Sequence, residues 1–268
     1  SWNAEKVPVS YGSNHIRMVL SYMAMRVSTN APIGLISQES WFRLEADMHF
    51  FMGPDEGFSD ALRPAIERML DDTILEWQVW VRGLAIPAEW QEAVIRSAIT
   101  LKLCQHEETG AIVAALTTSI PEHADSGRNW DYRYCWIRDA ALTTDAFMRM
   151  GYVDEARGFM RWLGARTREA NGSSDRPLQI MYGIRGEHVL EEKTLGHLSG
   201  YRNSSPVRIG NAAHDQFQLD IYGELMESVY IYNRHGWPIS YDMWMSLSGI
   251  LDWISNNWQE PDEGIWET

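Results

Sequence analysis

The chain has 268 residues, of which 45% are hydrophobic and 22% are charged, a composition typical of a globular protein. Its 37 acidic residues outnumber its 23 lysines and arginines, which gives a formal net charge of −14. Phosphate backbones and anionic membrane surfaces attract clustered cations, so this charge argues against nucleic-acid and membrane partners. No apolar run approaches the roughly 20 residues that a transmembrane helix needs.

The cysteines and the two ends of the chain bear on location and completeness. Cys104 and Cys135 are too few for a disulfide framework, so we expect a reduced, cytoplasmic chain. The sequence begins at Ser1 without the charged and apolar regions of a signal peptide, and it stops in a loop-like turn. We interpret it as a piece of a longer protein. The 13 Trp and 11 Tyr are either core side chains or the walls of a sugar-stacking cleft.

The first 57 residues show the alternation that is typical of strands. From Phe42 to Phe50 every second residue is apolar, which predicts a half-buried strand over residues 41–51. A looser alternation over residues 15–27, separated from the first by the turn residues 30–34, predicts an antiparallel neighbour. The glycine- and proline-rich residues 53–57 then end the β region.

After residue 57 the apolar period becomes helical. Steps of three and four residues predict about six helices, which lie near residues 66–81, 90–103, from 138 onward, 156–163, 215–235 and 244–258. The second of these is apolar on more than one face, which predicts a buried helix. Strands and helices do not alternate, so we do not expect a parallel sheet.

Three segments between the helices are rich in polar and aromatic residues: 121–138, 171–214 and 256–268. The middle segment is too long for a simple connection, and its apolar content argues against disorder, so it predicts a site-forming loop. The sequence contains no dinucleotide, phosphate-loop, nucleophile-elbow or zinc-protease motif, and its histidines never fall four residues apart on a helix. We therefore expect no metal ion.

Residues 129–139 pack four aromatic rings, two arginines and two aspartates into eleven positions. One interpretation is a charged helix entrance in which Arg138 and Asp139 are satisfied by their neighbours. The other is a sugar subsite, because rings stack on the C–H faces of a pyranose while Arg and Asp side chains bind its hydroxyls. Glycosidic chemistry needs such a grip, since the sugar must be held firmly enough to distort.

The C-terminal segment 260–267 carries four carboxylates within eight residues. Such a run is usually a solvated acidic turn. Glu267 differs from the others because it follows an Ile-Trp pair that could shield it from water. Loss of water disfavours the charged form of a carboxyl and raises its pKa toward that of a useful general acid.

Several of these motifs resemble glycoside hydrolase family 15, the glucoamylase family. Residues 136–139, Trp-Ile-Arg-Asp, resemble its Trp-x-Arg-Asp signature, and residues 264–267, Gly-Ile-Trp-Glu, resemble its general-acid segment. Residues 178–183, 200–201 and 206–211 are similar to the bacterial glucoamylase and trehalase-like branch. The resemblance covers roughly residues 60–268, and the motifs together are specific.

The resemblance implies a double barrel of twelve helices, in inner and outer rings of six, preceded in bacterial members by an antiparallel β-sandwich. We therefore expect a mainly α chain that contains about half of an (α/α)6 barrel. Residues 1–57 would end the β-sandwich domain, and residues 58–268 would form the first half of the catalytic barrel.

The resemblance also implies roles for particular residues. Glu267 would be the general acid, in a mechanism that requires no cofactor. The residues that would bind the terminal glucose are Tyr132, Trp136, Arg138 and Asp139, with Arg208, Asn211 and Trp266 in the same wall. The general base of the family is a glutamate from late in the barrel, and no residue here can be assigned that role. Thr268 stands where fungal members carry a second glutamate, so their leaving-group contacts do not transfer directly.

These features together predict the N-terminal part of an inverting α-glucoside hydrolase. One alternative is a relative that transfers glucose to a sugar instead of water, and another is a non-catalytic carbohydrate-binding or scaffold half-barrel. The sequence does not separate α-1,4-glucan, isomalto-linkages and trehalose as substrates. Residues 1–268 alone would expose inner helix faces, so we expect them to pack against the rest of the polypeptide or to form a homo-oligomer.

Overall fold

The computed structural model describes residues 6–170 and 176–265. The chain divides into two compact units, Ser1–Arg82 and Gly83–Thr268. The sheet ends close to residue 57, as the sequence predicted, but helix α2 (Leu62–Arg82) groups with the sheet in the first unit. A domain boundary at residues 57 and 58 therefore stays a prediction.

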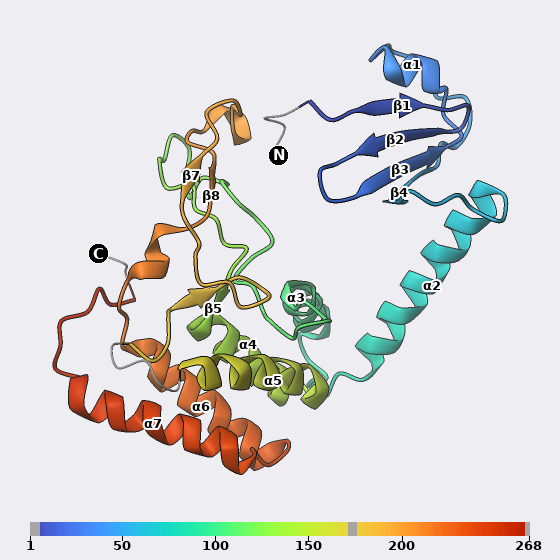
Figure 1. The fold of residues 1–268 in the computed structure, drawn as a ribbon. Helices are drawn as coiled ribbons and strands as arrows, with labels where there is room; N and C mark the ends of the chain where they lie inside the picture. Colours follow the sequence, from blue (N-terminus) through green and yellow to red (C-terminus); the bar gives the residue numbers. More distant parts are fainter. Residues whose placement is uncertain (1–5, 171–175, 266–268) are drawn as a thin grey trace. The chain divides into compact units, whose positions relative to one another are not determined.

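The first unit contains a four-stranded antiparallel sheet in the order β1-β2-β3-β4 (Figure 1). Its strands are β1 (Val9–Tyr11), β2 (His15–Val19), β3 (Ala24–Thr29) and β4 (Phe50–Pro54), and the short helix α1 (Ile33–Ser37) lies between β3 and β4 in the chain. Asp55 follows β4 and binds Arg17 of β2 and Arg26 of β3. These ion pairs fix the end of β4 to the neighbouring strands.

The predicted strand over residues 41–51 is wrong except at its end, because β4 begins only at Phe50. The Asn30 side chain occupies backbone groups that a strand would pair: its Nδ2 donates to the Asp47 carbonyl at 3.0 Å, and its Oδ1 accepts from the His49 N–H at 2.7 Å. Residues 15–27 are likewise two strands, β2 and β3, joined by a turn. The antiparallel pairing is confirmed, since β3 pairs with β4.

The second unit is mainly helical, as the sequence predicted. Its helices are α3 (Gln91–Cys104), α4 (Ile137–Arg149), α5 (Val153–Ala170), α6 (Asp220–His235) and α7 (Tyr241–Asn257). Helix α4 packs most extensively against α6, and α5 packs against both α4 and α7 (Figure 1). Their shared core includes the fully buried side chains of Phe147, Phe159, Leu225 and Leu247. In the described part of the chain, no helix is long and apolar enough to cross a membrane.

The expectation that the second predicted helix is buried is wrong. In helix α3 Ala98 is the one buried residue, and Leu103 is 46% exposed. In α7 the buried residues include Met243 and Leu247, whereas Trp244 is 51% exposed. An apolar stripe shows which helix faces can be buried, but the neighbouring elements decide which of them are covered.

Two short antiparallel strand pairs connect the long segments between the helices. Strand β5 (Cys135–Trp136) pairs with β6 (Met181–Tyr182), and β7 (Lys193–Thr194) pairs with β8 (Arg208–Ile209). Within the predicted site-forming loop 171–214, the described residues 176–214 contain β6, β7 and β8 and the 3-10 turns η1 (Tyr201–Asn203) and η2 (Ala212–Asp215). The β5–β6 pair brings residues 181–182 to the start of α4, and the β7–β8 pair joins residues 193–194 to residues 208–209.

Candidate active site

Arg138 and Asp139 are the second and third residues of α4, directly after β5. The Ile137 N–H donates to the Ile180 carbonyl at 3.0 Å, next to the pairing of β5 with β6. The first turn of α4, which carries the Trp-Ile-Arg-Asp motif, is therefore fixed to the motif at residues 178–183. A carboxylate in this turn is favoured by the positive end of the helix dipole.

The Arg138 guanidinium lies between two carboxylates. Its Nη1 is 3.2 Å from Asp220 Oδ2 and 3.3 Å from Gln218 Oε1, and its Nη2 is 3.3 Å from Asp139 Oδ2. We call Arg138, Asp139, Gln218 and Asp220 the Arg138 cluster. Sequence reasoning missed Gln218 and Asp220, since the sequence marks them only as the entrance of a helix. The packing of α6 against α4 makes them neighbours of Arg138.

Three buried polar atoms in and beside this cluster have no hydrogen-bond partner among the described residues. They are Trp136 Nε1, Asp139 Oδ2 and Asp220 Oδ1, although Asp139 Oδ2 does lie within ion-pair distance of Arg138. A buried polar atom without a hydrogen bond costs free energy, so such atoms are rare in native proteins. A hydroxyl can both donate and accept, and it could satisfy the indole and the carboxylates alike.

The electrostatics of Asp139 favour a hydrogen-bond donor beside it. Burial raises the pKa of the Asp139 carboxyl, Arg138 partly offsets this, and the charge of Asp220 adds to the increase. The ionised form of this carboxyl is thus less favourable than it would be in water. A hydroxyl that donates to it would replace part of the lost hydration.

Tyr132 and Trp136 lie beside each other, with ring centroids 6.2 Å apart and ring planes at 40°. Trp136 is only 3% exposed, so its ring packs in the protein interior and offers little open face. Tyr132 is half-buried. Their predicted contact with a sugar stays a prediction.

Asp131 joins the segment 129–139 to residues 206–211. Its side chain is fully buried and accepts from Arg133 Nε at 2.8 Å and Nη2 at 2.7 Å. Its Oδ2 also accepts from the Gly210 N–H at 3.2 Å, and its carbonyl accepts from Asn211 Nδ2 at 3.2 Å. The structure therefore brings together two segments that the sequence analysis assigned to one wall. Sequence reasoning did not single out Asp131 as the connection.

The side chains of Arg208 and Asn211 bind the protein itself. Arg208 Nε lies 3.0 Å from Glu192 Oε1, and its guanidinium stacks 4.7 Å from the Trp130 ring centroid. Asn211 Oδ1 accepts from the Ala213 N–H at 3.0 Å and so caps η2. These contacts hold the wall in place, and a contact of either side chain with a sugar stays a prediction.

The acidic turn near the C-terminus is docked onto the start of α6. Asp262 Oδ2 accepts from the Leu219 N–H at 2.8 Å, and Glu263 Oε2 accepts from the Phe217 N–H at 2.7 Å. These two carboxylates are therefore bound to backbone amides, unlike those of a freely solvated turn. The predicted site residues Trp266 and Glu267 lie outside the described residues.

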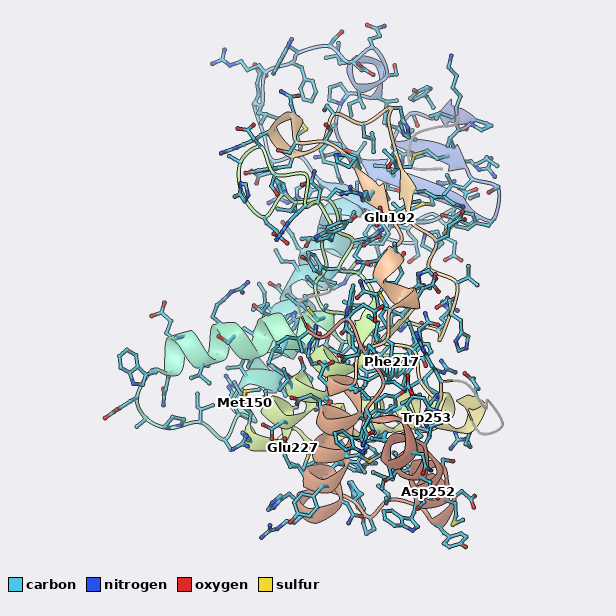
Figure 2. All side chains as sticks on the ribbon, turned by 90° about the vertical axis from the view of Figure 1, so that its left-hand side faces the viewer. Met150, Glu192, Phe217, Glu227, Asp252 and Trp253 are labelled. Atoms are coloured by element: carbon cyan, nitrogen blue, oxygen red, sulfur yellow. The ribbon has the colours of Figure 1, made fainter. Side chains whose placement is uncertain are left out.

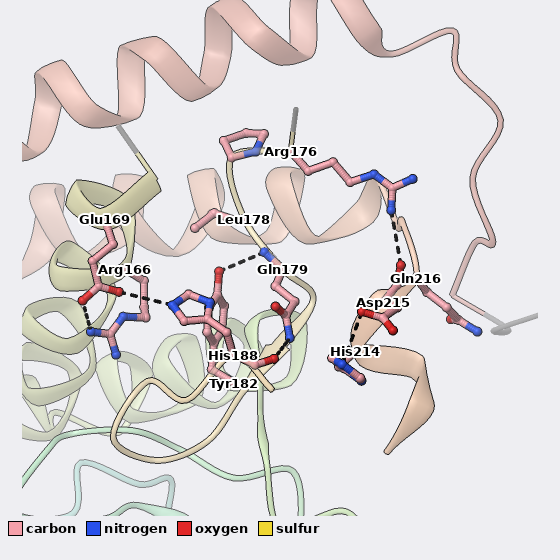
Figure 3. A pocket seen from close by; sticks show the side chains of 11 residues that line it. Arg166, Glu169, Arg176, Leu178, Gln179, Tyr182, His188, His214, Asp215 and Gln216 are labelled. Carbon is pink, nitrogen blue, oxygen red and sulfur yellow. Dashed lines mark hydrogen bonds and ion pairs between the residues drawn. The ribbon is translucent and has the colours of Figure 1, made fainter. Parts of the chain in front are cut away.

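A polar pocket of about 370 Å³ lies between the end of α5 and residues 176–188 and 214–216 (Figure 3). It is lined by an ion pair between Arg166 and Glu169 and by Gln216, whose Oε1 accepts from Gln218 Nε2 at 3.0 Å. The pocket therefore adjoins the Arg138 cluster through Gln216. Within residues 6–170 and 176–265, no three His, Cys, Asp or Glu side chains are grouped as metal ligands.

Comparisons with known proteins agree with the resemblance found in the motifs. The family model described as Glycosyl hydrolases family 15 matches residues 89–268. A protein named Trehalase from Mycolicibacterium smegmatis is 38% identical over 253 residues, which are 92% of this chain and 38% of that protein. A Trehalase from Mycobacterium tuberculosis is 36% identical over 257 residues, 92% of this chain and 37% of that protein.

These relatives extend the similarity through most of the first unit, and they are much longer than this chain, which spans less than two fifths of their length. Among solved structures, one named Glycosidase Wild Type matches with a TM-score of 0.46 and 23% identity. That match covers 66% of this chain and 43% of the solved chain.

Proposed function

This chain belongs to glycosyl hydrolase family 15, and on that basis we propose that the whole protein is a glycoside hydrolase that releases glucose from α-glucosides. The relatives named Trehalase, similar over 92% of the chain, support trehalose as the substrate. The observation that carries the proposal is the Arg138 cluster, where a family signature meets two buried carboxylate oxygens, Asp139 Oδ2 and Asp220 Oδ1, that accept no hydrogen bond from the residues that the structure describes.

The Arg138 cluster would bind the terminal glucose of the substrate. Asp139 would accept hydrogen bonds from sugar hydroxyls, and Arg138 would donate to their oxygens. Asp220 and Gln218 would hold the guanidinium in place, since both already contact Arg138 Nη1. Such charge-assisted contacts are stronger than neutral hydrogen bonds, and they fix the ring for the chemical step.

The proposed reaction is hydrolysis with inversion. Glu267, by the motif it shares with the family, would protonate the glycosidic oxygen as the bond breaks. A second carboxylate, which in this family comes from later in the barrel, would activate water on the opposite face of the sugar. Inverting enzymes hold these two carboxyls about 6.5–9.5 Å apart, which leaves room for the water.

The stereochemistry of the first products tests this proposal. The whole protein is incubated with α,α-trehalose, and the anomers are followed by proton NMR before they equilibrate. Inversion predicts one β-glucose from the attacked sugar and one α-glucose from the leaving sugar. Two α-glucose products would refute inversion, and activity on maltose or isomaltose without activity on trehalose would refute the substrate.

We also propose a cytoplasmic location, which is supported by the two free thiols, Cys104 and Cys135. Cys135 is buried, so its thiol is protected from oxidation to a disulfide by its position in the fold. Fractionation of cells that express the natural gene tests the location, and activity in the culture medium would contradict it.

A further inference from the structure

The four residues 217–220 face two partners at once. The backbone amides of Phe217 and Leu219 bind the acidic turn, while the side chains of Gln218 and Asp220 bind Arg138. We propose that Asp262 and Glu263 are positioning residues that lock the general-acid segment onto the segment that holds Arg138. This inference rests on the proposed function.

The contact between the acidic turn and residues 217–219 includes three hydrogen bonds. Glu263 forms two of them with Phe217: its carboxylate accepts from the Phe217 N–H at 2.7 Å, and its own N–H donates to the Phe217 carbonyl at 2.9 Å. Asp262 forms the third with the Leu219 N–H at 2.8 Å. Two of the three bonds are accepted by carboxylates, so these two are stronger than ordinary backbone pairs. Glu263 is half-buried and Asp262 is exposed, so Glu263 is expected to contribute more.

The receiving segment is itself firmly anchored (Figure 2). Phe217 is 5% exposed, and its ring meets Trp253 of α7 edge to face, with centroids 5.8 Å apart. The Arg176 guanidinium covers the same ring at 4.8 Å. A turn that binds this segment is therefore fixed to the packed helices and does not merely bind another loop.

Covalent geometry makes this lock relevant to catalysis. Glu267 follows Glu263 by four residues, and four residues of extended chain span at most about 14 Å. Holding Glu263 thus restricts where the proposed acid can lie relative to the Arg138 cluster. A proton donor must stand within hydrogen-bond reach of the glycosidic oxygen, and small misplacements lower the rate steeply.

The test compares Glu263→Ala with Glu260→Ala in the whole protein. Glu260 belongs to the same acidic turn, but its side chain is exposed and has no partner in the described part of the chain. We expect Glu263→Ala to lower kcat on trehalose about 10- to 100-fold with KM changed less than about threefold. On α-glucosyl fluoride, whose leaving group needs little protonation, the loss should be less than about threefold. Glu263→Gln keeps an acceptor oxygen and should retain more activity than Glu263→Ala.

Glu267→Gln, measured in the same series, distinguishes a failure of the positioning role from a failure of the proposed general acid. If it loses trehalose hydrolysis while Glu263→Ala and Glu260→Ala behave alike, the positioning role is overturned and the proposed function stands. If Glu267→Gln keeps trehalose hydrolysis, the proposed acid itself is wrong. Equal losses of Glu263→Ala on both substrates with a raised KM would also overturn the positioning role. If Glu263→Ala does not fold, Asp262→Ala and Glu263→Gln provide the same comparison.

Discussion

Asp139→Ala removes one of the two carboxylates beside Arg138 and leaves the other in place. Asp220 Oδ2 and Gln218 Oε1 remain 3.2 and 3.3 Å from Arg138 Nη1, so the guanidinium keeps two of its partners. The lost ion pair at 3.3 Å is offset by removal of a carboxyl whose pKa burial has raised. We therefore expect the free energy of unfolding to change by less than about 1 kcal/mol.

Activity should respond much more strongly. If Asp139 binds a glucose hydroxyl, the variant leaves that hydroxyl without its charged partner. Loss of one member of such a pair costs about 2–4 kcal/mol. At about 1.4 kcal/mol for each tenfold change, kcat/KM on trehalose should fall about 30- to 1,000-fold.

Asp154→Ala is the matched control. Asp154 also lies in the first turn of a helix and pairs with an arginine, Arg157, but its side chain is 83% exposed. Steady-state kinetics on trehalose and thermal unfolding are measured for both variants in the whole protein. If Asp139→Ala retained kcat/KM as well as Asp154→Ala does, with a comparable Tm, the subsite assignment would be wrong.

Three further predictions concern acid catalysis, the buried connection and pH. Glu267→Gln should lower kcat on trehalose about 10²–10⁴-fold and lose far less on α-glucosyl fluoride, whereas Glu260→Gln should change neither rate by more than a small factor. Asp131→Ala should lower the free energy of unfolding by about 1–3 kcal/mol in urea denaturation, because it removes the fully buried acceptor of Arg133 and of the Gly210 N–H; no measurable loss would contradict this. Because the pKa of Asp139 is raised on folding, its ionised form disfavours the folded state. Any Tm advantage of Asp139→Asn over the wild type should therefore be largest above the folded pKa and should vanish below about pH 3.9. A Tm advantage that grew on acidification would refute this sign.

The sequence by itself determined the helices of the second unit and the family signature. Apolar residues at steps of three and four reflect the geometry of a single helix, so a helix can be recognised without knowing which element packs against it. The start of α4 could be located for the same reason, and with it Arg138 and Asp139. The alternation over residues 41–51 misled because a strand exists only where another strand pairs with it, and there Asn30 takes the backbone groups instead.

Only the tertiary structure decided which groups complete the site. Gln218 and Asp220 lie about 80 residues from Arg138 in the chain, and the packing of α6 against α4 makes them its partners. Glu263, which looks equivalent to Glu260 in the sequence, is distinguished by hydrogen bonds to Phe217, 46 residues away. Composition and periodicity record what a residue can do locally. The choice of partner depends on which distant backbone amides and side chains the folded core leaves within reach.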